Sequence, residues 1–294
     1  MFGGITMSDK TKGIIFILIA SLGFAFMSIF VKLAGDIPVF QKVFFRNFVS
    51  MIVSLIMVTA HKDSYYGKKE HQKLLLLRSS LGTAGMLLFF WSIGQLVAAD
   101  ANMLNKLSSF FLILFSFLFL GERITRKQLI AIVVAFLGSL FIIKPSFDFN
   151  VLPYLTSILA AMFAGGAYTV LRVLGKKEKY YTVVLYFSTF SVIALLPFVI
   201  IYYQPVTGIQ WLYLMLTGVG ATIGQFGTTL AYKYAPASEI SIFNYSNVVF
   251  ITLLAIPILG EIPDYLSLIG YVVIFAASFA MFQSKKTKEI TPSA

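Results

Sequence analysis

The sequence predicts an all-α integral membrane protein with ten transmembrane helices arranged as two five-helix repeats of inverted topology. Three observations support this prediction. Hydrophobic residues make up 59% of the 294 residues and charged residues only 12%, more apolar surface than one soluble core of this length would bury. Ten stretches are long and apolar enough to cross a bilayer. A set of residues from the first half also recurs in the second half.

A transmembrane helix needs about 20 predominantly apolar residues. The stretches that meet this requirement are 13–34, 38–60, 74–97, 99–120, 126–144, 152–174, 180–203, 209–234, 238–260 and 263–283. The connections are short, and the longest is the lysine-rich segment 61–73. Consecutive helices are therefore expected to lie side by side and antiparallel. The first stretch is too long for the apolar core of a signal peptide, so we interpret it as the first span.

The basic residues are distributed unevenly between the connections. With the N-terminus in the cytoplasm, most of them fall on the cytoplasmic side, in segments 10–12, 62–73, 123–127, 172–179 and 285–288. Lys32 and Lys144 fall in outer loops. This asymmetry predicts a multi-pass protein of the cytoplasmic (inner) membrane with both termini in the cytoplasm. It also accounts for the net charge of +11 without any need for nucleic-acid binding.

The internal repeat divides the chain into residues 1–147 and 148–294. Leu120-Gly121-Glu122 recurs as Leu259-Gly260-Glu261, and at the same offset Asn105 corresponds to Asn244 and Gly85 to Gly224. Because each half has an odd number of spans, the second half enters the membrane from the opposite side. Such symmetry is the usual basis of alternating access.

Several of these motifs carry a family resemblance. The run Leu96–Ala101, the helix end Phe119–Glu122 and their counterparts Ala235–Glu239 and Leu259–Asp264 resemble the drug/metabolite transporter superfamily, EamA type, over nearly the whole chain. The segment Leu77–Gly82 with Arg78, and the segment Glu261–Asp264, look more like the branch that contains S-adenosylmethionine and organic-anion carriers. The resemblance implies a secondary transporter of a small organic metabolite rather than an enzyme.

The chain departs from the family pattern at three positions. Ser109 and Val248 stand where a proline is frequent, and Lys106 stands where the pattern is usually apolar. Lys106 lies about two turns into the fourth stretch and shares a polar helix face with Asn102, Asn105 and Ser109. Charged groups inside the bilayer are costly and are functional candidates by default. We expect Lys106 to contact an anionic substrate; the alternative is a buried salt bridge to Asp100 or Glu239.

Arg46 is the second charged candidate, because a guanidinium suits bidentate capture of carboxylate or phosphate. Its alternative role is to donate to carbonyl groups of a neighbouring helix. Arg78 is nearer the cytoplasmic end of its span, where we expect its side chain to snorkel to the interface. The other substrate-binding candidates are aromatic or uncharged polar residues that could equally pack or bridge helices: Trp91, Tyr168, Tyr186, Gln225, Ser241, Asn244 and Tyr245.

The predicted function is therefore transport of an anionic or zwitterionic metabolite by alternating access, coupled to protons or to exchange. We expect a small-molecule substrate and the lipid bilayer as partners, a monomer or weak dimer, and no cofactor, metal or nucleic acid. One alternative is an amine exporter using Asp100 or Glu239 with an aromatic cage. The other is a non-transporting membrane enzyme or a lipid-handling scaffold, although no catalytic motif is evident.

Overall fold

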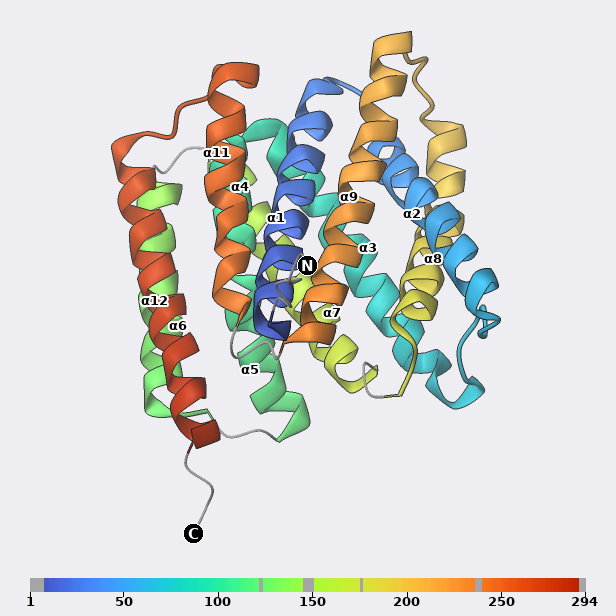
Figure 1. The fold of residues 1–294 in the computed structure, drawn as a ribbon. Coiled ribbons are helices and arrows are strands. Elements are labelled where there is room, and N and C mark those ends of the chain that lie inside the picture. Colours follow the sequence, from blue (N-terminus) through green and yellow to red (C-terminus); the bar gives the residue numbers. More distant parts are fainter. Residues whose placement is uncertain (1–7, 122–123, 145–150, 175–176, 236–239, 291–294) are drawn as a thin grey trace, which may run out of the picture.

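The structure is a computed structural model that describes residues 8–121, 124–144, 151–174, 177–235 and 240–290, apart from the side chains of 232, 233, 241 and 284–290. Within these residues the regular elements are helices (Figure 1). The first half contains α1 (Asp9–Leu33), α2 (Val39–His61), η1 (Lys69–His71), α3 (Gln72–Gln95), α4 (Ala98–Asn105), α5 (Ser108–Leu120) and α6 (Arg126–Ile143). The second half contains α7 (Leu152–Leu174), α8 (Tyr180–Ile201), α9 (Gly208–Tyr234), η3 (Ser241–Tyr245), α11 (Ser246–Leu259) and α12 (Tyr265–Ile290).

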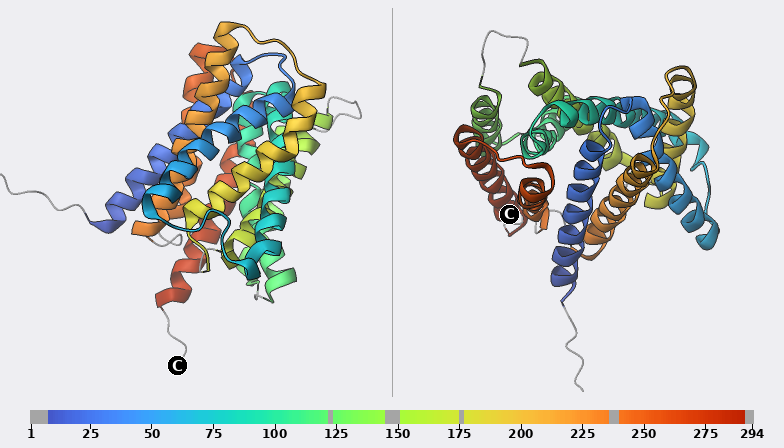
Figure 2. Two further views of the ribbon diagram at one scale, coloured as in Figure 1. Left: turned by 90° about the vertical axis from the view of Figure 1, so that its right-hand side faces the viewer. Right: turned by 90° about the horizontal axis from the view of Figure 1, so that it is seen from above.

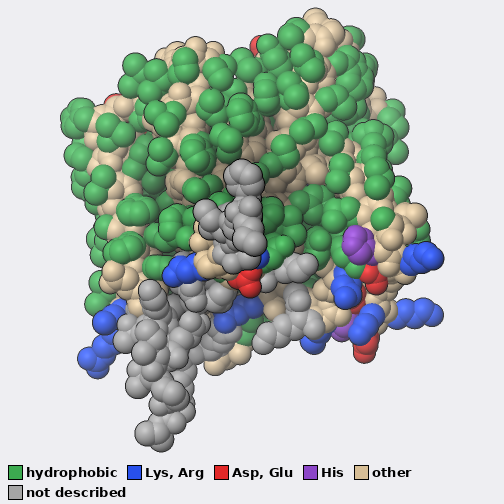
Figure 3. Space-filling model, viewed as in Figure 1, with side chains coloured by type: hydrophobic (Ala, Val, Ile, Leu, Met, Phe, Trp, Pro, Cys, Tyr) green, Lys and Arg blue, Asp and Glu red, His purple; other side chains and the backbone are tan. Residues whose placement is uncertain are grey.

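Length and hydropathy identify nine membrane spans in the described part of the chain, with α4 and α5 forming one of them. The tenth helix is α9, 27 residues long, whose glycines and polar residues make it less apolar and which packs along α1. Hydrophobic side chains cover most of the face shown in Figure 3, and Lys and Arg gather at its lower edge. Side chains such as Phe119, 75% exposed, would face lipid. The ten-helix membrane fold is confirmed.

The prediction that consecutive helices lie side by side is wrong, because the main helix contacts join helices that are far apart in the sequence. These contacts instead follow the exchange of the two halves. In the repeat, α7 corresponds to α1, α9 to α3 and α11 to α5. The contact of α1 with α9 therefore corresponds to that of α7 with α3, and the contact of α1 with α11 to that of α7 with α5. The remaining main pairs, α2 with α8 and α6 with α12, each join a helix to its own counterpart and lie at opposite edges of the bundle (Figure 2). The inverted repeat is thus visible in the packing. The boundary predicted at 147/148 falls outside the described residues and stays a prediction.

Glycines allow α1 and α9 to approach closely. A Cβ atom at Gly23 would lie 2.8 Å from the carbonyl oxygen of Gly220, and one at Gly220 would lie 2.8 Å from the carbonyl oxygen of Gly23. On the same helix, a Cβ at Gly227 would lie 3.0 Å from the Cβ of Ala20. The two backbones therefore touch where no side chain separates them, as small residues permit in membrane helices.

The fourth and ninth spans are each interrupted at equivalent positions. α4 ends at Asn105, and the amides of Ser109 and Phe110 donate to the carbonyls of Lys106 (3.2 Å) and Leu107 (2.9 Å), which is 3₁₀ geometry. In the second half the 3₁₀ helix η3 ends at Tyr245, 139 residues after Lys106. The sequence predicted continuous helices over 99–120 and 238–260, and the structure breaks both. Such mid-helix 3₁₀ turns often mark hinges.

Candidate functional site

Arg46 lies in the interior of the bundle, with 3% of its surface exposed. Its Nη1 donates to Oδ1 of Asn47 (2.7 Å), and its Nη2 donates to Oε1 of Gln225 on α9 (3.0 Å). Its Nε is buried without an acceptor among the described residues. Gln225 belongs to a neighbouring helix, so the alternative considered from the sequence, donation to carbonyl groups of such a helix, holds for the side-chain carbonyl of this residue. Amides orient the guanidinium but leave its charge uncompensated.

Arg78 does not snorkel, contrary to the prediction. It is 8% exposed, and its guanidinium carbon lies 4.0 Å from the ring centroid of Phe187 on α8. Its Nε and Nη1 are buried and have no acceptor within the described part of the chain. Because α3 begins at Gln72, Arg78 lies nearly two turns inside the helix, where α8 covers it. The neighbouring helix keeps the guanidinium away from the interface.

The two arginines belong to one cluster. The guanidinium carbon of Arg46 lies 5.9 Å from the centroid of the same Phe187 ring. Tyr168 on α7 is 46% exposed and interacts electrostatically with both guanidinium groups. We call this group, with Gln225, the arginine cluster: Arg46, Arg78, Tyr168, Phe187 and Gln225. It is assembled from α2, α3, α7, α8 and α9, so both halves contribute to it.

Lys106 lies half-buried at the break between α4 and α5. It forms no ion pair with Asp100, whose carboxylate instead accepts from the hydroxyl of Tyr271 (2.6 Å). The other acid considered, Glu239, lies outside the described residues. Asn102 donates to Oγ of Ser28 (3.1 Å) and thereby joins α4 to α1. The two remaining candidates of this face, Asn105 and Ser109, are half-buried beside the break.

The other candidates of the second half are not members of the arginine cluster. Tyr245 is buried, and its hydroxyl is hydrogen-bonded to Ser278 on α12. Asn244 lies in the same 3₁₀ turn, and the side chain of Ser241 lies outside the described residues. Tyr186 packs with a separate apolar group around Leu75 and Leu174. Of the sequence candidates, the structure therefore brings together Arg46, Tyr168 and Gln225.

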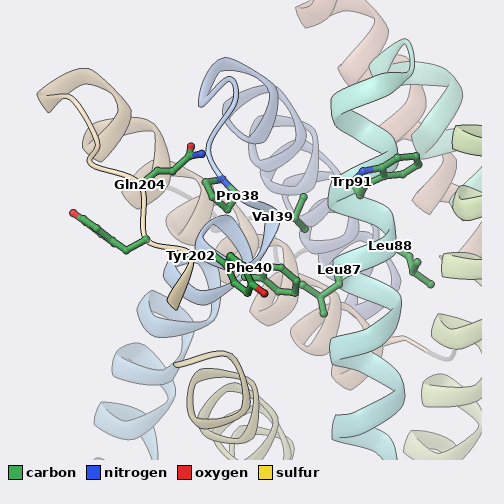
Figure 4. Close-up of a pocket in the computed structure, with 9 residues that line it drawn as sticks. Pro38, Val39, Phe40, Leu87, Leu88, Trp91, Tyr202 and Gln204 are labelled. Carbon is green, nitrogen blue, oxygen red and sulfur yellow. The ribbon is translucent and has the colours of Figure 1, made fainter. Parts of the chain in front are cut away.

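Trp91 lines a groove of about 680 Å³ between α2, α3 and the end of α8 (Figure 4). The lining residues are Pro38, Val39, Phe40, Leu87, Leu88, Trp91, Tyr202, Tyr203 and Gln204. None of these side chains is charged, so the groove can solvate apolar or aromatic groups but offers no counter-charge. None of the lining residues belongs to the arginine cluster, and Lys106 is not among them.

Ion pairs connect the halves at the end of the bundle opposite the N-terminus. Lys144 at the end of α6 pairs with Asp264, just before α12. Partial burial alone would raise the pKa of the Asp264 carboxyl, but hydrogen bonds from Lys144 and from the backbone of Ser267 hold it below its ordinary value. Glu261, from the repeated Leu-Gly-Glu motif, pairs with Lys32. Its repeat counterpart, Glu122, lies outside the described residues.

Sequence reasoning missed Asn47 and Phe187 and assigned Arg78 to the interface. The charge of Arg78 within a predicted span was a usable signal, because a charge inside a membrane helix requires an explanation. Phe187 gave no signal, since it is one of 30 phenylalanines in a chain whose lipid-facing surface is also apolar.

The chain is similar to known membrane transporters. It is 31% identical to the pseudopaline exporter CntI of Pseudomonas aeruginosa over 94% of this chain and 97% of that protein. It is 26% identical to the S-adenosylmethionine uptake transporter of Rickettsia felis over 84% of each chain. It is also 24% identical to human solute carrier family 35 member G1, covering 90% of this chain and 77% of that one.

A solved crystal structure shares the fold, with a TM-score of 0.61 at 16% identity over 93% of this chain and 99% of that chain. The profile of the EamA-like transporter family matches twice, over residues 11–144 and again over residues 151–283. Each match covers one five-helix half, so the family's two-repeat architecture coincides with the repeat seen in the packing. The chain belongs to the EamA-like transporter family of the drug/metabolite transporter superfamily, whose members move small molecules across membranes and are not enzymes.

Proposed function

We propose that this protein is a secondary transporter of a small anionic or zwitterionic organic metabolite, working by alternating access in the cytoplasmic membrane. The observation that carries the proposal is the pair of buried arginines. Arg46 and Arg78 have three guanidinium nitrogens with no acceptor among the described residues. A buried donor without an acceptor and a buried charge without a counter-charge are both costly. An acidic group on a bound substrate would relieve both costs.

The helix contacts support alternating access. Each main contact between the halves recurs when the halves are exchanged, or joins a helix to its own counterpart. In an inverted repeat, exchanging the conformations of the two halves converts an opening on one side of the membrane into an opening on the other. The paired 3₁₀ interruptions at Lys106 and Tyr245 are suitable hinges for such an exchange. We propose that substrate binds where the halves meet, and the arginine cluster, to which both halves contribute, is such a place.

The charge distribution supports both termini in the cytoplasm. Lys and Arg side chains gather at the end of the bundle from which the C-terminus leaves (Figure 3). By the positive-inside rule this end faces the cytoplasm. The end that carries Lys32, Glu261 and Asp264 would then face outward. We propose proton coupling or exchange as the driving mode.

The amine-exporter alternative has less support. A cation site needs an acid that is free to meet the substrate, whereas the carboxylate of Asp100 accepts a hydrogen bond from Tyr271. Among relatives, one is named for pseudopaline export and another for S-adenosylmethionine uptake. Both names support a small metabolite as the substrate class.

Counterflow in proteoliposomes tests the proposal. Vesicles are preloaded with pooled carboxylates and amino-acid derivatives, or with pooled amines, and uptake of labelled tracer is followed with and without a pH gradient. We expect accumulation with the anionic or zwitterionic pool. Accumulation with the amine pool alone would refute the proposal that the substrate is anionic or zwitterionic. An effect of the pH gradient distinguishes proton coupling from exchange.

A further inference from the structure

The side chain of Phe187 places the two guanidinium groups close to each other. Their central carbons lie 5.9 Å and 4.0 Å from its ring centroid, so they are at most 9.9 Å apart, the sum of the two distances. Arg46 also interacts electrostatically with Arg78. Two like charges at this separation repel one another across a poorly polarisable interior.

The described residues supply no acid to this pair. Their ion pairs lie elsewhere: Asp9 with Lys12, Glu261 with Lys32, Glu178 with His71 and Asp264 with Lys144. The ionisable groups within electrostatic range of Arg46 are Arg78 and the phenol of Tyr168, and a phenol is uncharged at neutral pH. Within the described part of the chain, the pair thus carries two positive charges without a counter-charge.

The surroundings hold both side chains in defined positions. Asn47 donates from its Nδ2 to the carbonyl of Val43 (3.0 Å), which fixes the amide that accepts from Arg46. Gly82 lies one turn beyond Arg78, and a Cβ there would lie 2.9 Å from Cε2 of Phe187 and 3.5 Å from Nη1 of Arg78. The absence of a side chain at Gly82 makes room for the arginine beside the ring. Ordered donors that lack acceptors are the features of a preorganised anion site.

We propose that the Arg46–Arg78 pair binds a substrate with two carboxylates, one acid group compensating each guanidinium. This inference rests on the proposed function and names the substrate class of the same site. A dicarboxylate supplies the two negative charges that the pair lacks and enough oxygens for the three unpartnered nitrogens. A monocarboxylate would leave one buried charge uncompensated, and an amine would add a third positive charge.

The test compares matched ligands on the wild-type protein, so that it does not depend on a variant folding. Purified protein is heated with α,ω-dicarboxylates from succinate to pimelate, with their monomethyl esters and with a phosphate monoester. Ligands that bind the native state raise its melting temperature. We expect one or more dicarboxylates to stabilise the protein and to compete in counterflow at least about tenfold better than the matching monoester, the usual effect of one hydrogen-bonded charge.

The variant Arg78→Gln then tests whether Arg78 binds the second carboxylate. Relative to wild type, this variant is expected to lose the preference for the dicarboxylate while still responding to the monoester through Arg46. Lys12→Gln, an exposed site at the end of α1, is the matched control and should keep the preference. Equal competition by diacid and monoester, or a better response to the phosphate monoester, would overturn the two-carboxylate assignment. Absence of counterflow with every anion would instead overturn the proposed function itself.

Discussion

Lys32 and Glu261 form an ion pair that joins the two halves at the end of the bundle opposite the N-terminus. The Glu261 carboxylate also accepts from the backbone amide of Ala98 (2.8 Å) at the start of α4. Lys32 donates in addition to the carbonyl of Leu96 at the end of α3. One acid from the second half therefore holds α1, α3 and α4 of the first half together. This arrangement is suited to holding that end closed, which the following labelling experiment tests.

Breaking this ion pair should open the outer end more often. The side chains of the pair are each 18% exposed, so its contribution is about 1 kcal/mol, or a shift of about fivefold in the populations. The chain contains no cysteine, so a single cysteine at Ser28, a buried residue one turn from Lys32, reports access cleanly. We expect Glu261→Gln to increase labelling of Ser28→Cys by an impermeant thiol reagent added from outside.

Two controls accompany this labelling experiment. Reversing both charges, with Lys32→Glu and Glu261→Lys, should restore part of the protection. Lys12→Gln removes an exposed ion pair at the other end of α1 and should leave the labelling unchanged. Equal labelling of the Glu261→Gln variant and its parent would show that the pair does not hold the outer end closed.

The contact between Gly23 and Gly220 should be essential for stability. Gly220→Ala would place a Cβ atom 2.8 Å from the carbonyl oxygen of Gly23 and 2.9 Å from the amide of Met27, so α1 and α9 would have to move apart. Overpacking of this kind costs about 1–3 kcal/mol. Gly94→Ala is the control, because a Cβ there meets nothing within 4 Å. In detergent, the melting temperature of Gly220→Ala should fall clearly below that of the wild type, whereas that of Gly94→Ala should not. Similar melting temperatures for the two variants would contradict the close contact of α1 and α9.

A fixed acid beside Arg46 should compete with the substrate. Gln225 accepts from Nη2 of Arg46 at 3.0 Å, so Gln225→Glu would give this guanidinium a permanent counter-charge of nearly the same shape. We expect the variant to fold at least as stably and to lose anion affinity by about tenfold or more. Affinity is read from counterflow competition and stability from melting. Unchanged affinity with a stable fold would exclude Arg46 as an anion ligand.

Lys106 and its counterpart Tyr245 should respond differently to neutral substitutions. Lys106 forms no ion pair with Asp100, whose carboxylate accepts from Tyr271, whereas the hydroxyl of Tyr245 is bonded to Ser278. We expect Lys106→Gln to reduce anion counterflow by about tenfold, and Lys106→Arg to preserve part of it. Tyr245→Phe should cost about 1 kcal/mol of stability and little transport. Wild-type transport by Lys106→Gln would remove this residue from the site.

The sequence was sufficient for the fold because the governing signals are local. A bilayer requires helices of about 20 apolar residues, and these can be counted directly. Pairs such as Gly121 with Gly260, both with a φ of +68° at a helix end, are visible as a repeated motif. The breaks beside Lys106 and Tyr245 were not predictable, since a 3₁₀ turn in a helix depends on contacts with neighbouring helices rather than on the residues themselves.

The site was predictable only in part, for a related reason. Arg46 and Lys106 stand out because charge inside a membrane span is rare. Their partners are set by tertiary packing: Gln225 is 179 residues from Arg46 in the chain, and Phe187 approaches Arg78 from another helix. Arg78 was assigned to the interface because its position along α3 was considered without the neighbouring α8. Distance from a helix end did not reveal which helix covers it.

The most direct test of the account is counterflow of the anionic pool by the wild-type protein and Arg46→Gln in parallel, with melting curves to establish that both are folded. The account predicts accumulation by the wild type, and a loss of about tenfold or more in Arg46→Gln despite a native melting transition. Equal accumulation by the two proteins would contradict the central claim that a buried guanidinium in the bundle binds the transported anion.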